Sequence, residues 1–198
     1  MTHFLLVRHG QTGDHGRTLS GDAGVSLNDT GRAQVRALGE RLCELGVAAI
    51  YHSPIARTHE TAALIAERLG LPPRVCEEVA EVRFGAFTGR DFVELDRDPA
   101  FQRWNGFRSG TRAPGGELMV QAQARAISAL DRLRSEHPAA VVLVVSHADV
   151  IKAALAYFLG APLDLFQRLE ISPATVSTLR LDEHSAAVLS VNVRGDAI

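Results

Sequence analysis

The chain has 198 residues, 46% of them hydrophobic, and a formal net charge of −2 at pH 7. This is enough apolar material to bury the core of one globular domain, so we expect a single domain over residues 1–198. The lack of a basic excess argues against nucleic acid or an anionic membrane surface as a partner.

Cysteine usage and hydropathy favour a cytoplasmic protein. Cys43 and Cys76 match neither a disulfide framework nor a Cys-x-x-Cys metal pair, and we interpret both as buried thiols of a reducing compartment. No stretch approaches the roughly 20 apolar residues of a membrane span. We expect no signal peptide, because the first apolar run begins within a few residues of Met1.

Hydrophobic patterning predicts alternating strands and helices. In chain order they are a strand at 4–7, a helix around 35–45, a strand at 48–51, a helix around 62–69, a strand at 74–77, a helix around 120–130, a strand at 141–145, a helix around 151–158, and strands at 176–181 and 187–193. The runs 4–7 and 141–145 are apolar throughout, which is typical of parallel strands buried on both faces. The alternation predicts an α/β fold, a three-layer α-β-α sandwich with a mainly parallel sheet.

Residues 82–117 interrupt this alternation. They contain several phenylalanines, the only tryptophan (Trp104) and a segment rich in glycine and proline. A long insertion in a compact domain is commonly a lid or a binding loop, and its aromatic residues argue against disorder. We therefore predict a small, partly helical cap over the functional site.

Groups suited to phosphate chemistry follow three of the predicted strands. Arg8 and His9 come directly after the first, Arg57 comes shortly after the second, and His147 follows the strand at 141–145. Ligands of parallel α/β sheets bind at the carboxyl ends of the strands, and Glu81 at the start of the insertion can reach the same edge. Imidazole supplies a nitrogen nucleophile and guanidinium a bidentate phosphate clamp.

The segments around these residues match a known pattern in order and spacing. They are residues 8–12, 27–34, 53–58, 81–85, 114–117 and 145–147. In these segments, and over nearly its whole length, the chain resembles the histidine phosphatase superfamily, the fold shared by phosphoglycerate mutases and fructose-2,6-bisphosphatases. The resemblance implies an α-β-α sandwich and chemistry through a phosphohistidine.

The resemblance also implies roles for individual residues. His9 would attack phosphorus, Glu81 would act as general acid and base, and His147 would complete the catalytic set. Arg8, Arg57 and His147 would bind the phosphoryl oxygens. These roles agree with the chemistry, because neighbouring arginines lower the pKa of an imidazole and a general acid accelerates departure of an alkoxide roughly 10²–10⁴-fold.

The surroundings of the site depart from the family's common pattern. His15 stands where asparagine is common, and Ala148-Asp149 stands where small residues usually follow the second histidine. The candidate substrate or phosphate contacts are Gln11, Thr12, His15, Ser53, Glu117 and Ala148. Competing interpretations are a surface loop for His15 and a helix-start position for Glu117 and Asp149.

These observations predict a phosphomonoester hydrolase that needs no metal or other cofactor and acts on a small phosphorylated metabolite. Two alternatives remain: phosphoryl transfer of the phosphoglycerate mutase type, and a non-catalytic phosphate-binding module. The modest length of the cap favours the hydrolase, and the presence of every catalytic group argues against the module. The sequence leaves the substrate open, and it is compatible with a homodimer.

Overall fold

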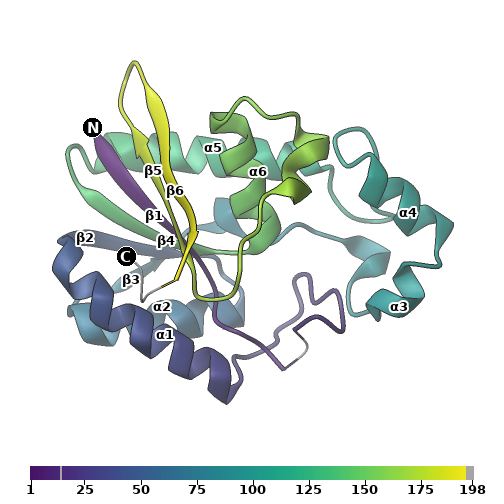
Figure 1. The fold of residues 1–198 in the computed structure, drawn as a ribbon, viewed down its shortest axis with the longest axis horizontal. Helices are drawn as coiled ribbons and strands as arrows, with labels where there is room; N and C mark the ends of the chain where they lie inside the picture. Colours follow the sequence, from purple (N-terminus) through teal and green to yellow (C-terminus); the bar gives the residue numbers. More distant parts are fainter. Residues whose placement is uncertain (14, 195–198) are drawn as a thin grey trace.

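A six-stranded sheet occupies the centre of the molecule, with helices on both faces (Figure 1). The computed structural model describes residues 1–13 and 15–194. The strands are β1 (Thr2–Arg8), β2 (Val47–His52), β3 (Pro73–Val75), β4 (Val141–Ser146), β5 (Val176–Leu181) and β6 (Ala186–Val193). Their order is β3-β2-β4-β1-β5-β6, and the pairs from β3 to β1 are parallel, whereas β5 and β6 are antiparallel to their neighbours. The prediction of a mainly parallel sheet inside an α/β sandwich is confirmed.

The central strands are apolar on both faces because each face is covered. In β1, Phe4 and Leu6 pack into the core on one side of the sheet, and Leu5 and Val7 pack into the core on the other side. Successive side chains of a strand point to opposite faces, so an uninterrupted apolar run is required here. β1 and β4 therefore lie at the centre of the fold.

Two helices cover one face of the sheet (Figure 1). Helix α1 (Asp29–Leu42) begins after Asn28, whose side chain accepts a hydrogen bond from the backbone N–H of Gly31 at 2.7 Å. Helix α2 (Ala56–Leu69) ends at Gly70, which adopts the left-handed conformation with φ of 68°. Apolar residues of both helices pack on the sheet, among them Val35, Leu38, Leu42, Ala62 and Ile65.

The opposite face is covered by α5 (Met119–Glu136) and α6 (Ala148–Phe158) (Figure 1). Both helices bury a run of alanines, and those of α5 are Ala122, Ala126 and Ala129. Because alanine is short, α5 and α6 can approach the sheet and each other closely. None of the helices in the described part of the chain is long and apolar enough to cross a membrane.

The segment 82–117 forms the cap at one end of the sheet (Figure 1). It contains a 3₁₀ turn (Gly85–Phe87) and the helices α3 (Phe92–Leu95) and α4 (Pro99–Gly106). Its buried aromatic side chains pack mostly edge to face or tilted, with ring centroids 5.3–5.7 Å apart; they are Phe84, Phe87, Phe101 and Trp104. The predicted partly helical cap is present, and its aromatic cluster explains why it is ordered.

Two sequence-based expectations need correction. Cys43 is exposed rather than buried, because it lies at the end of α1, past the last turn that packs on the sheet; Cys76 is buried as expected. The third strand is shorter than predicted and ends at Val75, because the chain turns into a 3₁₀ turn at Glu77–Val79. Glu81, two residues after that turn, lies near Arg57 and His147 at the end of the sheet.

Candidate active site

The site begins where β1 and β4 end side by side. The two strands are parallel and in register, so that Arg8 lies opposite Ser146. The backbone N–H of His9 donates to the carbonyl of Ser146 at 3.1 Å, and the imidazole centroids of His9 and His147 are 5.4 Å apart. Parallel pairing thus brings two distant motifs to one edge of the sheet.

The hydrogen bonds of His9 define its tautomer. Its Nδ1 lies 2.8 Å from the carbonyl oxygen of Gly10, which can only accept, so Nδ1 carries the proton. Its Nε2 accepts from Nε of Arg57 at 3.1 Å. The pKa of His9 is held well below its ordinary value, first by burial and then by the charges of Arg57 and Arg8. Nε2 of His9 is therefore unprotonated, and its electron pair, which here accepts from Arg57, is the one that a nucleophile uses.

Arg57 organises the centre of the site from the first turn of α2. Its side chain is 2% exposed, and Nη2 donates both to the carbonyl of Gly21 at 2.6 Å and to Nδ1 of His147 at 3.0 Å. Nη1 donates to the carbonyl of Ala23 at 3.2 Å. The guanidinium thus connects both histidines to the loop that follows β1.

His147 is the residue before α6, and it lies behind Arg57. It is fully buried and its Nε2 is 2.8 Å from Oγ of Ser53. Burial and the charge of Arg57 hold the pKa of His147 well below its ordinary value, so the ring is neutral. In this structure it supports Arg57, and its direct contact with phosphate stays a prediction.

Glu81 approaches the same centre from the start of the cap. Its Oε2 is 3.7 Å from Nη2 of Arg57 and 3.7 Å from Nδ1 of His147, and its Oε1 accepts from the backbone N–H of Val82 at 3.0 Å. Burial, followed by the negative charge of Asp149, raises the pKa of Glu81 to about 7. A carboxyl group with this pKa can both donate and accept a proton near neutrality.

Arg8 offers an unused donor to the site. Its Nη1 donates to the carbonyl of Ile171 at 2.6 Å, whereas its buried Nε has no hydrogen-bond partner within the described residues. A buried donor left without a partner is unfavourable unless a ligand satisfies it. An anion bound beside His9 would do so.

These groups line a cavity of about 250 Å³, which we call the catalytic cavity. Its wall comes from the C-terminal end of β1, the first residues of α2 and α6, Glu81, the cap and, in the loop after β1, residues 12, 15, 16 and 18–21. The loop and the cap are joined by backbone hydrogen bonds, including Leu19 N–H to Arg90 at 3.0 Å and Phe92 N–H to Arg17 at 2.9 Å. The lining residues used below are Arg8, His9, Thr12, His15, Thr18, Leu19, Ser20, Arg57, Glu81, Phe84, Phe92, Ala148 and Asp149.

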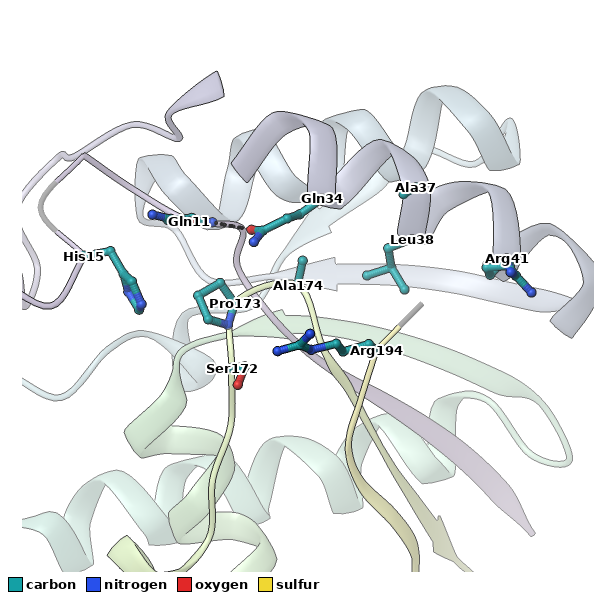
Figure 2. Close-up of a pocket in the computed structure, with 10 residues that line it drawn as sticks. All are labelled: Gln11, His15, Gln34, Ala37, Leu38, Arg41, Ser172, Pro173, Ala174 and Arg194. Atoms are coloured by element: carbon teal, nitrogen blue, oxygen red, sulfur yellow. Dashed lines mark hydrogen bonds between the residues drawn. The ribbon is translucent and has the colours of Figure 1, made fainter. Parts of the chain in front are cut away.

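Three of the six predicted additional contacts line the catalytic cavity: Thr12, His15 and Ala148. Gln11 instead lines a neighbouring cavity of about 600 Å³, where its backbone N–H donates to Oε1 of Gln34 at 3.2 Å (Figure 2). His15 contributes to both cavities. Substrate contact by Gln11 is thus not supported by its position.

Ser53 and Glu117 are buried away from the catalytic cavity. Ser53 is fully buried against His147. The carboxylate of Glu117 accepts from the backbone N–H of Arg83 at 3.0 Å and from Nη2 of Arg125 at 2.8 Å. The structure thus places neither side chain in the lining of the catalytic cavity, and the predicted substrate contact of Ser53 and Glu117 has no support from their positions. Glu117 joins the two ends of the cap to α5.

The cavity lining also includes Asp149, which the sequence did not mark as a residue of the site. It was interpreted as a helix-start residue, and it does lie in the first turn of α6, but it also lines the catalytic cavity. The available signal was its position two residues after His147, where the sequence departs from the common pattern. Its partner Arg108 belongs to the cap, 41 residues away, and could not be paired with it from the sequence.

The comparison with family models decides the classification. The model of the histidine phosphatase superfamily (branch 1) matches residues 4–194. The chain belongs to the histidine phosphatase superfamily. Among the described residues, no group of three or more His, Cys, Asp and Glu side chains is arranged to hold a metal ion.

Similar histidine phosphatases carry several different names. The chain is 37% identical over 180 residues to the "Bifunctional protein Rv2228c" of Mycobacterium tuberculosis; the match covers 89% of this chain and 49% of that protein, so the chain spans about half the length of this relative. It is 28% identical to "Phosphoserine phosphatase 1" of Hydrogenobacter thermophilus, and the match covers 98% of this chain and 93% of that protein. It is 29% identical to "Probable phosphoglycerate mutase GpmB" of Yersinia pestis, and the match covers 92% of this chain and 86% of that protein.

Solved structures share the fold of this chain. YhfR of Bacillus stearothermophilus superposes with a TM-score of 0.90 at 29% identity, covering 98% of both chains. The mycobacterial glucosyl-3-phosphoglycerate phosphatase Rv2419c superposes with a TM-score of 0.88 at 26% identity, covering 96% of this chain and 98% of that one. The phosphohistidine mechanism is general for this superfamily.

Proposed function

We propose that this histidine phosphatase hydrolyses small phosphomonoesters through a phosphohistidine on Nε2 of His9, without a metal ion. One observation carries the proposal. The unprotonated Nε2 of His9 accepts a hydrogen bond from the buried Arg57, Arg8 lines the same cavity, and a carboxyl group with a pKa of about 7 lies at the same centre. These are the nucleophile, the phosphate clamp and the proton donor that the reaction needs.

In the first step the phosphate group of the ester enters the catalytic cavity, and Arg8 and Arg57 donate to its oxygens. Nε2 of His9 attacks phosphorus as the bond from phosphorus to the ester oxygen breaks, and Glu81 transfers its proton to the departing oxygen. The transition state of phosphoryl transfer is stabilised mainly by positioning and by fixed positive groups. The arginines provide both.

In the second step the carboxylate of Glu81 removes a proton from a water molecule. The resulting hydroxide attacks phosphorus, the bond from phosphorus to Nε2 of His9 breaks, and inorganic phosphate leaves. His147 and Ser53 act behind these groups, because their hydrogen bonds keep Arg57 oriented towards His9. The site then returns to its starting protonation state.

The names of the relatives support either hydrolysis or mutase-type transfer. Two of the similar proteins are named phosphatases, and one is named a probable phosphoglycerate mutase. A phosphoglycerate mutase must bind a sugar acid that carries a carboxylate beside its phosphate. In the described lining of the catalytic cavity the guanidinium groups are those of Arg8 and Arg57, and both are needed for the reacting phosphate, so we favour hydrolysis.

The test measures release of inorganic phosphate from p-nitrophenyl phosphate with and without a chelator, together with rapid-quench detection of a phosphoenzyme. We expect turnover that is insensitive to the chelator and an acid-labile phosphoenzyme that is absent in His9→Ala. Loss of activity in the chelator with recovery on adding a metal ion would overturn the metal-free mechanism. Isomerisation of 3-phosphoglycerate that outpaces phosphate release would identify a mutase, and complete inactivity would indicate a binding module.

A further inference from the structure

A second carboxylate faces the catalytic cavity and has no part in the reaction steps above. Asp149 lies in the first turn of α6 and lines the cavity, with its side chain 20% exposed. Asp149 lies at the positive end of the α6 dipole and forms an ion pair with Arg108. The cavity therefore contains a fixed negative charge.

Arg108 holds this carboxylate from behind. Its Nη1 is 2.5 Å from Oδ2 of Asp149, and its guanidinium lies 4.0 Å from the ring centroid of Trp104 and 5.0 Å from that of Phe166. Nη2 also donates to Oδ1 of Asn105 at 2.7 Å. Arg108 is buried and is not part of the lining of the cavity. The pair thus directs its negative end towards the cavity and its positive end into the cap.

The charge of Asp149 is felt across the cavity. Burial is the largest influence that raises the pKa of Glu81, and the charge of Asp149 adds to it against Arg57 and Arg8. Burial lowers the pKa of Arg8, and Asp149 is one of the carboxylates that oppose this lowering. The carboxylate of Asp149 thus acts on both Glu81 and Arg8 while it is paired with Arg108. A leaving group placed between Glu81 and the cap would experience the same field.

Apart from the N-terminus of α6, where Asp149 itself lies, the rest of the described lining offers no free cationic side chain to a second anion. Arg8 and Arg57 are engaged by the reacting phosphate, and His9 is the nucleophile. Burial and the charge of Arg8 lower the pKa of His15, so its ring is neutral near pH 7. The remaining wall consists of two glycines and of apolar and hydroxyl side chains, namely Gly16, Gly21, Leu19, Phe84, Phe92, Ala148, Thr12, Thr18 and Ser20.

We propose that Asp149, held by Arg108, is a specificity-determining residue that restricts this phosphatase to phosphate esters of uncharged or cationic alcohols and disfavours leaving groups with a second anionic charge. This inference rests on the proposed hydrolase function. A carboxylate or second phosphate on the leaving group would meet Asp149 without a described cation to compensate it. An ammonium or hydroxyl group would instead find an acceptor there, and the apolar part would pack on Leu19 and Phe92.

The test uses three esters of similar size that differ in charge: 2-aminoethyl phosphate, 2-hydroxyethyl phosphate and 2-phosphoglycolate. We expect kcat/KM for phosphoglycolate to be at least about 10-fold below that for the hydroxyethyl ester, because like charges in contact oppose binding. Asp149→Asn preserves the shape of the side chain and should reduce the ratio of kcat/KM for the hydroxyethyl ester to that for phosphoglycolate by about 10-fold. It should also reduce the ratio of kcat/KM for the aminoethyl ester to that for the hydroxyethyl ester. Asp131→Asn, the same change at an exposed site on α5, is the control and should leave both ratios unchanged.

The two proposals fail in different ways. Equal kcat/KM for phosphoglycolate and the hydroxyethyl ester, or an unchanged ratio in Asp149→Asn, would overturn the role of Asp149. Calorimetric binding of the three esters to His9→Ala provides the same ranking without turnover. One outcome separates the two proposals: none of the esters is hydrolysed, but their affinities follow their charge and this order depends on Asp149. In that case the hydrolase proposal fails, and the selection by charge stands. Binding that ignores ester charge would refute the selection itself.

Discussion

Nε of Arg57 donates to Nε2 of His9 at 3.1 Å, while Nη2 of the same guanidinium donates to His147. One buried side chain thus contacts both imidazoles, which belong to motifs far apart in the sequence. The planar guanidinium can make several such bonds in a fixed geometry, and lysine cannot. The site therefore depends on arginine at this position.

The first prediction tests this dependence. Arg57→Lys should lower kcat/KM for p-nitrophenyl phosphate by about 10²–10³-fold, the usual effect of removing one oriented donor from a transition state. Arg68→Lys, on the exposed side of the same helix, is the matched control and should retain activity. Steady-state kinetics on both variants, with circular dichroism to verify folding, makes the measurement. Activity of Arg57→Lys within about threefold of the parent would contradict the assignment.

The second prediction concerns the proton on Glu81. Because burial raises the pKa of this carboxyl to about 7, the protonated form that donates to the leaving oxygen is lost as pH rises above 7. We expect kcat/KM for an alkyl phosphate to fall over that range, and the fall to be absent in Glu81→Gln. The variant should lose about 10²–10⁴-fold on alkyl esters and less on p-nitrophenyl phosphate, whose leaving group needs no proton. Identical losses on both esters would place the general acid elsewhere.

The third prediction follows from the charges that face Glu81. Asp149 raises the pKa of Glu81, whereas Arg57 and Arg8 lower it. Asp149→Asn removes the raising influence, so the descending limb of the pH profile should move to lower pH. The profile of kcat/KM between pH 5 and 9 measures the shift. A limb that stays in place, or moves upwards, would show that Asp149 does not act on Glu81.

The fourth prediction concerns stability. The pKa values of His9 and His147 are held well below the ordinary value of 6.5, so the unfolded chain binds more protons than the native one just below pH 6.5. The free energy of unfolding should therefore decrease as pH falls through this window. Urea unfolding at several pH values measures the slope, and His9→Asn should reduce it. A slope that is unchanged in this variant would exclude His9 as a source.

The fifth prediction tests the structural role of Glu117. Glu117→Gln weakens a buried ion pair with Arg125 and a hydrogen bond to the backbone of Arg83, so it should lower the free energy of unfolding by about 1–3 kcal/mol. Glu136→Gln breaks an exposed pair with Arg132 and should change it by about 1 kcal/mol or less. Thermal and urea denaturation compare the two variants. If both variants lower the free energy of unfolding equally, the buried contacts of Glu117 contribute no more to stability than the exposed pair of Glu136.

Much of the fold could be predicted, because in the central strands and helices the hydrophobic pattern of the sequence matches the burial that the sheet imposes. The apolar run at Phe4 requires burial on both faces, and the strand Val176–Leu181 is found where its pattern predicted it. The ends of elements were harder to place. The third strand stops early at Val75 because a 3₁₀ turn follows it, and no residue pattern announced that turn.

The sequence by itself determined that a histidine and an arginine follow the first buried strand, and that a second histidine follows another. Strand periodicity and the rule that parallel strands present one end to a ligand were sufficient to bring these groups together in the prediction. Only the tertiary structure decided which charges meet. Asp149 pairs with Arg108 and faces the cavity, and Glu117 pairs with Arg125 and does not. Such pairings join segments that are adjacent in space and separated in sequence, so no local pattern records them.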